Sequence, residues 1–237
     1  MNTILHKSDS RGHANHGWLN SYHSFSFASY HNPDRMSFGV LRVLNDDTVA
    51  GSMGFGAHPH ENMEIISIPL SGDLKHEDST GRTTIIKNGD IQVMSAGTGI
   101  THSEKNASQN EEVKFLQIWV IPNQQNVTPR YDQITLDPNN RRNQFEQILS
   151  PNPEDAGVWI HQDAWFHLGT FEKGIKSTYQ INKSDNGVYA FVLKGSFKIG
   201  DQEMSHRDGL GIWEASSFEL TSLSENAEIL LMEVPLG

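Results

Sequence analysis

The chain has 237 residues, a formal net charge of −11 and no cysteine. The absence of cysteine excludes disulfides, thiolate metal ligands and cysteine nucleophiles, and the acidic charge argues against nucleic acid or an anionic membrane as a partner. Because no apolar run approaches the roughly 18 residues of a membrane span and the N-terminus has no signal-peptide pattern, we expect a soluble, cytoplasmic protein.

Short apolar runs between clusters of Gly, Asn, Asp and Ser recur along the chain. This pattern predicts an all-β sandwich or barrel, and it argues against a helical bundle. The predicted strands, in chain order, are residues 38–43, 64–70, 83–87, 91–94, 115–121, 189–193, 196–199, 211–213 and 228–234. No long segment has a clean period of 3.6, so we expect at most short helical turns, within residues 122–154.

That middle stretch, residues 122–154, is rich in Pro, Asn and Gln. Proline fixes φ and removes a hydrogen-bond donor, so central strands are not expected there. We therefore place a boundary near residue 140, which gives two domains, 1–140 and 141–237. A faint repeat supports the division, because a strand, a turn glycine (Gly72 or Gly195) and a second strand follow one another in each half.

The first cluster with chemical character is His58-Pro59-His60. On a strand, residues i and i+2 share a face and their Cα atoms lie ~6–7 Å apart. Two imidazoles at that spacing can converge on one ion at ~2.1 Å. Pro59 takes the opposite face and predicts an edge or a bulge at this point.

The second cluster, His102 and Glu104, has the same spacing and follows a turn that contains Gly97 and Gly99. A barrel brings non-adjacent strands to a shared interior, so three imidazoles and one carboxylate could surround one ion. One His-x-His in a chain with 12 histidines is more often accidental, but the two pairs together favour a metal site. Fe, Mn, Co and Ni prefer six ligands, which leaves two positions for water, dioxygen or substrate oxygens.

Five segments carry a resemblance to a known family. They are Arg11-Gly12 with Gly17-Trp18, HSFSF at 23–27, GVLRVLN at 39–45, His58-Pro59-His60 with Glu64, and GDIQVMSAGTGITHSE at 89–104. In these segments the chain resembles the pirin family of the cupin superfamily, densely in the first half and more thinly afterwards. The resemblance implies a bicupin, with two stacked antiparallel β-barrels in one chain and a metal only in the N-terminal barrel.

The family's ligand pattern corresponds to His58, His60, His102 and Glu104. Cupins in general take their carboxylate from shortly after His-x-His, which would be Glu64 here, but the pirin pattern takes it from the second motif. Glu104 is therefore expected to be the ligand, and Glu64 to support the site. The second half has no ligand at the matching positions, which are Ile181, Lys183, Ser222 and Ser224. We expect one divalent transition metal, with iron first and Mn, Co, Ni, Cu or Zn as alternatives.

The chain is most similar to bacterial pirins that resemble quercetin 2,3-dioxygenase. That resemblance implies oxidative cleavage of a quercetin-like flavonol with release of carbon monoxide, with a small aromatic substrate and O2 as partners. Glu104 would be the catalytic group that accepts the proton of the flavonol 3-hydroxyl. The alternatives are a redox-sensing, iron-binding regulator that acts through protein contacts, and another cupin reaction on a small metabolite. A monomer is expected.

Other polar residues receive structural interpretations. His76, Asp78 and Ser79 precede Gly81 and are interpreted as a solvated hairpin. The residues interpreted as strand packing first and a pocket rim second are His23, Ser24 and Ser26. The histidines interpreted as isolated are His161, His167 and His206. The apolar residues that could wall a dry pocket near the ligands are Met53, Phe55 and Met94.

Overall fold

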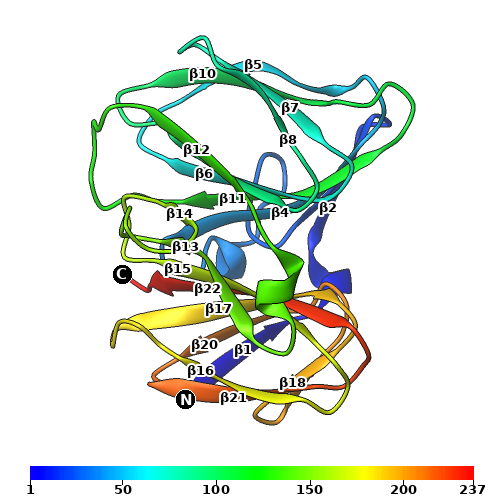
Figure 1. Cartoon of the computed structure of the whole chain (residues 1–237), viewed down its shortest axis with the longest axis vertical. Helices are drawn as coiled ribbons and strands as arrows, with labels where there is room; N and C mark the ends of the chain where they lie inside the picture. The colour runs from blue at the N-terminus through cyan, green and yellow to red at the C-terminus, as the bar shows by residue number, and fades with distance from the viewer.

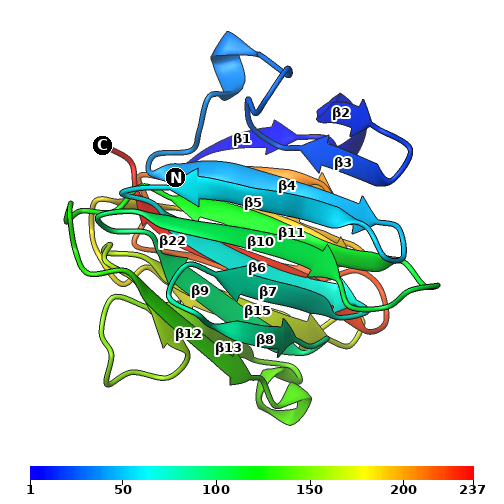
Figure 2. The same ribbon diagram turned by 90° about the horizontal axis from the view of Figure 1, so that it is seen from above.

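The strands form four sheets, and Figure 1 shows these stacked in layers with the two larger sheets in the middle. A computed structural model describes all 237 residues. The larger sheet of the first half has the order β12 (Arg130–Thr135), β9 (Asp90–Ser95), β6 (Glu64–Ser71), β11 (Val113–Val120), β4 (Leu41–Val49), β3 (Leu19–His23) and β2 (Gly12–Asn15). The smaller sheet has the order β5 (Gly54–His60), β10 (Ile100–Asn106), β7 (Leu74–Asp78) and β8 (Thr83–Ile86). Seen from above in Figure 2, the smaller sheet lies across the larger one.

The second half repeats this arrangement. Its larger sheet has the order β1 (Asn2–His6), β20 (Gly209–Trp213), β17 (Asn186–Lys194), β22 (Ala227–Pro235), β15 (Trp165–Phe171), β13 (Phe145–Ser150) and β14 (Val158–Trp159). Its smaller sheet has the order β16 (Lys176–Gln180), β21 (Ser217–Ser222), β18 (Phe197–Ile199) and β19 (Gln202–Met204). The only helices are the 3-10 turns η1 (Ser8–Ser10), η2 (Pro33–Arg35) and η3 (Pro138–Arg141). None of them is long and apolar enough to cross a membrane.

The all-β prediction is confirmed. The turn glycines of the faint repeat adopt the same backbone conformation, since φ is +73° at both Gly72 and Gly195. No hydrogen-bonded ladder joins the larger sheet of either half to its smaller sheet. Each half is therefore a sandwich of two sheets, and its description as a closed barrel stays a prediction.

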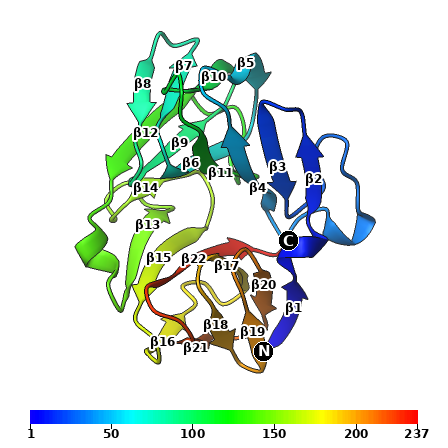
Figure 3. The same cartoon turned by 90° about the vertical axis from the view of Figure 1, so that its right-hand side faces the viewer.

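The N-terminal strand belongs to the larger sheet of the second half. β1 pairs with β20, with Ile4 opposite Gly211, and Figure 3 shows it in the lower half while β2 and β3 lie above. β1 thus lies in the first predicted domain by sequence but pairs with a strand of the second half, a tertiary contact that local sequence does not encode, and the division into 1–140 and 141–237 stays a prediction. Residue 140 itself lies in η3, between β12 and β13.

The largest apolar cluster lies between the two seven-stranded sheets. Leu116 and Ile118 of β11 contribute to it together with Phe166 of β15 and Leu230 of β22. Successive side chains of a strand alternate between faces, so Gln117 of the same strand points into the first-half sandwich. Because both faces of the central sheets are covered, their sequences are nearly continuous apolar runs.

The interiors of the two sandwiches differ in character. Fifteen buried apolar residues fill the second-half sandwich, Phe171 and Phe197 among them. The first-half sandwich has only two small apolar clusters, of six and four residues. Buried His76, His102 and Glu104 belong to neither cluster, so a polar region remains inside this half.

Candidate metal centre

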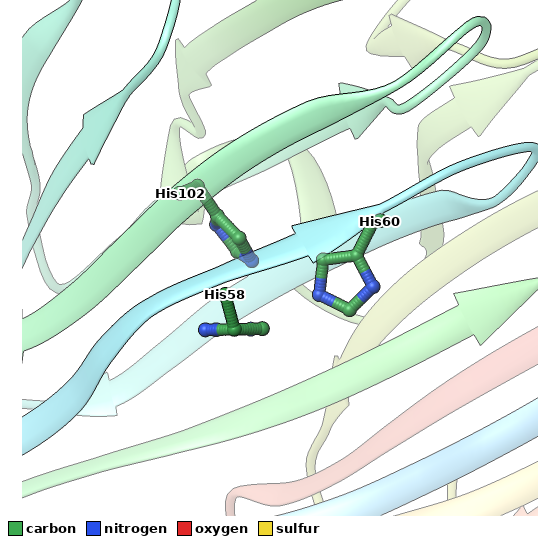
Figure 4. Close-up of side chains that lie close together, drawn as sticks. All are labelled: His58, His60 and His102. Atoms are coloured by element: carbon green, nitrogen blue, oxygen red, sulfur yellow. The ribbon is translucent and has the colours of Figure 1, made fainter.

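The predicted ligand pairs lie on two strands of the four-stranded sheet that are directly hydrogen-bonded to each other. This corrects the expectation of non-adjacent strands. β5 is an edge strand, as Pro59 predicts, and β10 begins after a turn in which Gly97 and Gly99 have φ of +48° and +130°. His102 pairs with His58, and Figure 4 shows the three imidazoles gathered on one side of the two strands.

The three rings form a nearly equilateral triangle. Their centroids are 4.8 Å apart for His58 and His60, 4.6 Å for His58 and His102, and 5.0 Å for His60 and His102. One nitrogen of each ring lies within 4.8 Å of those of the other two. A cation between the rings would therefore be close to all three.

The nitrogens of His60 and His102 fit a metal and lack another partner, whereas His58 Nδ1 lies 2.8 Å from the Gly56 carbonyl oxygen and leaves Nε2 free for an ion. His60 Nε2 and both nitrogens of His102 are buried without a hydrogen bond, a state that costs ~1–3 kcal/mol per group when nothing compensates. Burial, with a smaller contribution from neighbouring histidines, lowers the pKa of His60 to about 4 and that of His102 to about 3. Both rings are thus neutral at pH 7, which is the form that binds a metal.

Glu104 lies beside this triangle. It is 2% exposed, and its oxygens accept hydrogen bonds from Ser67 Oγ at 2.8 Å and from Gln117 Nε2 at 2.5 Å. Burial raises its pKa. Its ligand atom lies within 4.8 Å of those of His76 and His102. The structure thus brings the three histidines together and places Glu104 next to one of them, while the four-ligand set stays a prediction.

Glu64 is buried outside the group of three histidines. Its carboxylate accepts a hydrogen bond from Ser95 Oγ at 2.6 Å and a long one from the His161 amide at 3.4 Å. Burial raises its pKa to about 7. It makes no hydrogen bond to any of the four predicted ligands, so a direct supporting contact is not observed.

His76, Asp78 and Ser79 lie in a hairpin, as predicted, because β7 pairs with β8, and Ser79 is exposed, but the side chains of His76 and Asp78 are not solvated. Their side chains are 1% and 0% exposed, and His76 Nε2 lies 2.9 Å from Asp78 Oδ2. They lie on β7 opposite Glu104 and His102 of β10, respectively. The sequence contains the signal, because His76 and Asp78 have the same i, i+2 spacing as the two ligand pairs.

A cavity of about 710 Å³ opens beside the histidines. Its aromatic walls are Trp18, Phe27, Phe55 and Trp119. His58, His60 and Glu104 also border it. Of the apolar residues predicted to wall a pocket, Phe55 does so, whereas Met53 is 40% exposed and Met94 packs against Ile65 and Ile100.

One wall of this cavity is polar. Ser21 Oγ donates a hydrogen bond to Asp47 Oδ1 and lies 2.8 Å from His23 Nε2. Burial raises the pKa of Asp47 to about 7. His23 therefore lines the pocket, which was the second of its two interpretations. Asp47 was missed, because Asn45-Asp46-Asp47 has the composition of a turn.

The chain matches two family models and several curated proteins along most of its length. Residues 5–120 match the family model described as Pirin, and residues 147–234 match the quercetinase C-terminal cupin domain. The chain is 41% identical to quercetin 2,3-dioxygenase of Escherichia coli, over 98% of both chains. It is 37% identical to a pirin-like protein of Caulobacter vibrioides, over 95% of this chain and 96% of that protein.

Solved structures of similar proteins have the same fold. The bacterial pirin of Escherichia coli in complex with nickel(II) superposes with a TM-score of 0.94, at 39% identity and with 100% of both chains covered. A quercetin 2,3-dioxygenase from Acinetobacter baumannii superposes with a TM-score of 0.78, covering 98% of this chain and 86% of that one. Its 20% identity supports the fold alone.

Proposed function

Because the chain belongs to the pirin family, we propose that it cleaves a quercetin-like flavonol with dioxygen and releases carbon monoxide. It is an oxidoreductase of the quercetin 2,3-dioxygenase type. The proposed centre is one metal ion held by His58, His60, His102 and Glu104. We propose iron as the native ion, and manganese, cobalt, nickel, copper or zinc could bind the same donors.

One observation carries the proposal. Three imidazoles converge beside a cavity that has aromatic walls, and those of His60 and His102 have buried nitrogens without a partner. Ligand pockets are typically concave and apolar, with a few polar groups that fix orientation. Trp119 is one such wall, and its ring centroid lies 4.9 Å from that of His60. A planar aromatic substrate would therefore lie against Trp119 with one edge at the histidines.

The protein groups have separate roles in this proposal. When bound, the ion would supply Lewis-acid and redox chemistry. His58, His60 and His102 would hold it, and burial keeps the His60 and His102 rings in the neutral form that binds a metal. Glu104, fixed by Ser67 and Gln117, is positioned to accept the proton of the flavonol 3-hydroxyl.

The cavity walls would orient the substrate. Phe55 and Trp119 would pack on its rings and exclude water. Ser21, His23 and Asp47 offer hydroxyl, imidazole and carboxyl groups on the polar wall, where a second hydroxyl of a polyphenol could bind. We expect the protein to act as a monomer, because its two larger sheets already cover one another.

An oxygen-dependence assay tests the function. Metal-loaded protein is mixed with quercetin in air and under nitrogen, and the flavonol absorbance and carbon monoxide are followed. We expect the flavonol absorbance to fall and carbon monoxide to form only in air. His206→Gln, at an exposed position in the second half, serves as the active control. If metal-loaded protein consumes no flavonol in air, the dioxygenase proposal is wrong, and a regulator that acts through protein contacts becomes the better description.

A further inference from the structure

Two buried residues on β7 lie next to the histidine triangle. His76 Nε2 is 2.9 Å from Asp78 Oδ2. Asp78 also accepts hydrogen bonds from Thr80, through its backbone amide at 2.9 Å and its hydroxyl at 2.5 Å. An ionised carboxylate only accepts hydrogen bonds. His76 Nε2 therefore donates to Asp78, which leaves Nδ1 as the ring nitrogen that can accept a hydrogen bond.

That acceptor has no partner. His76 Nδ1 is buried and makes no hydrogen bond. The ring of Tyr131 lies beside it, with centroids 4.8 Å apart, and Arg82 stacks on Tyr131. A buried polar atom without a partner is rare in native proteins and calls for an explanation. A nearby donor would satisfy it.

His102 can supply the donor. Both of its nitrogens are buried without a hydrogen bond, and a metal ion would use only one of them. The ring centroids of His76 and His102 are 5.4 Å apart. An N–H···N bond of ~2.9 Å between two imidazoles places their centres roughly 5.2 Å apart. The observed separation is close to that value, and one nitrogen of each ring lies within 4.8 Å of one of the other.

We propose that His76 and Asp78 are positioning residues for the metal centre. His102 donates from its nitrogen that does not face the metal to His76 Nδ1, and His76 donates in turn to Asp78. The chain His102–His76–Asp78 fixes the tautomer and the orientation of His102. Partners of this kind typically change metal affinity by 10–100-fold when they are removed. The inference rests on the metal centre of the proposed function, but not on its substrate.

Two variants separate positioning from packing. His76→Phe keeps an aromatic ring beside Tyr131 and removes both nitrogens. Asp78→Asn keeps the shape of the side chain but can also donate, so it weakens the constraint on the His76 tautomer. His167→Phe is the matched control, because His167 is a histidine of the second-half sandwich whose Nδ1 lies 3.2 Å from the Tyr179 hydroxyl.

The readout is zinc affinity of the full-length chain, measured by competition with a chelator, together with thermal unfolding of each variant. We expect His76→Phe to bind one zinc per chain with 10–100-fold weaker affinity. Asp78→Asn should shift affinity in the same direction by less, and His167→Phe should not shift it. Nitrogen-15 NMR of the metal-free protein should show one fixed tautomer of His102 in the wild type and a mixture in Asp78→Asn.

Two results would overturn the inference. If His76→Phe binds zinc as tightly as wild type, His76 and Asp78 contribute only to packing. Loss of zinc as complete as in His102→Ala would make His76 a ligand. If His76→Phe does not fold, Asp78→Asn and its NMR spectrum decide. A wild type that binds zinc but consumes no flavonol with any metal would refute the proposed function. The variants would still test the hydrogen bonds from His102 to His76 and from His76 to Asp78.

Discussion

The turn before β10 leaves no room for a side chain at Gly97. Gly97 has φ of +48°, and a Cβ added to it would lie 2.0 Å from the Val127 carbonyl oxygen. That oxygen accepts a hydrogen bond from the Thr98 amide at 3.0 Å, so it cannot withdraw without loss. A left-handed non-glycine residue costs ~1–2 kcal/mol, and forcing an overpacked contact adds ~1–3 kcal/mol.

Gly97→Ala should therefore lower the free energy of unfolding by about 2–5 kcal/mol. For a chain of this size, this corresponds to a Tm lower by roughly 4–20 °C. Gly17→Ala is the control, since Gly17 has φ of +82° but no atom within 4 Å of its added Cβ. Gly17→Ala should lower the free energy of unfolding only by the cost of the left-handed backbone, ~1–2 kcal/mol.

Thermal and denaturant unfolding of the metal-free proteins measures both losses, and zinc titration then reports the effect on His102. We expect Gly97→Ala to bind zinc more weakly than Gly17→Ala, because β10 starts from this turn. If the two variants lose the same stability and keep the same zinc affinity, the turn does not position β10 as argued.

Three further predictions concern the cavity and two buried carboxyl groups. Trp119→Phe should raise KM for quercetin by about 2–10-fold with kcat little changed, because an aromatic contact is worth ~0.5–1.5 kcal/mol; steady-state kinetics checks this. Burial alone would raise the pKa of Asp208, but hydrogen bonds from Lys7 and two backbone amides outweigh burial, so the pKa lies below its usual value. Its stabilisation is complete above the unfolded pKa of ~3.9 and is lost as pH falls through the folded value. Asp208→Asn should thus cost ~1.5–3 kcal/mol at pH 7 and much less near pH 3, measured by urea unfolding. Burial raises the pKa of Glu64 to about 7, so the folded state loses stability as pH rises from ~4.3 to that value. Glu64→Gln should therefore stabilise the protein by roughly 1–3 kcal/mol at pH 8 and keep its metal, and metal loss in this variant would contradict its assignment outside the ligand set.

The ligand positions could be predicted from sequence because strand periodicity is local. His58 and His60 share a face wherever their strand lies, and the proline between them restricts it to an edge. The same rule applies to His76 and Asp78, but the polar Ser-Thr-Gly that follows them is typical of a turn. Their burial depends on pairing with β10, a contact that their own segment does not encode.

The polar wall shows a different limit. The strand predicted at residues 38–43 begins at Leu41 and continues to Val49. Phe38 instead closes a tight turn in which Gly39 has φ of +54°. The end of β4 was missed because alternation identifies a strand only when its buried face is apolar. Here the buried residues Asn45 and Asp47 are polar because they line the cavity. The end of the strand therefore lacks the alternation of apolar and polar residues.

The central claim is that this chain holds one metal ion through the histidine triangle. Elemental analysis of protein purified without added metal tests it, with wild type, His102→Ala and His206→Ala prepared in parallel. We expect close to one transition-metal ion per chain in wild type and His206→Ala, and almost none in folded His102→Ala. Full metal content in His102→Ala would contradict it.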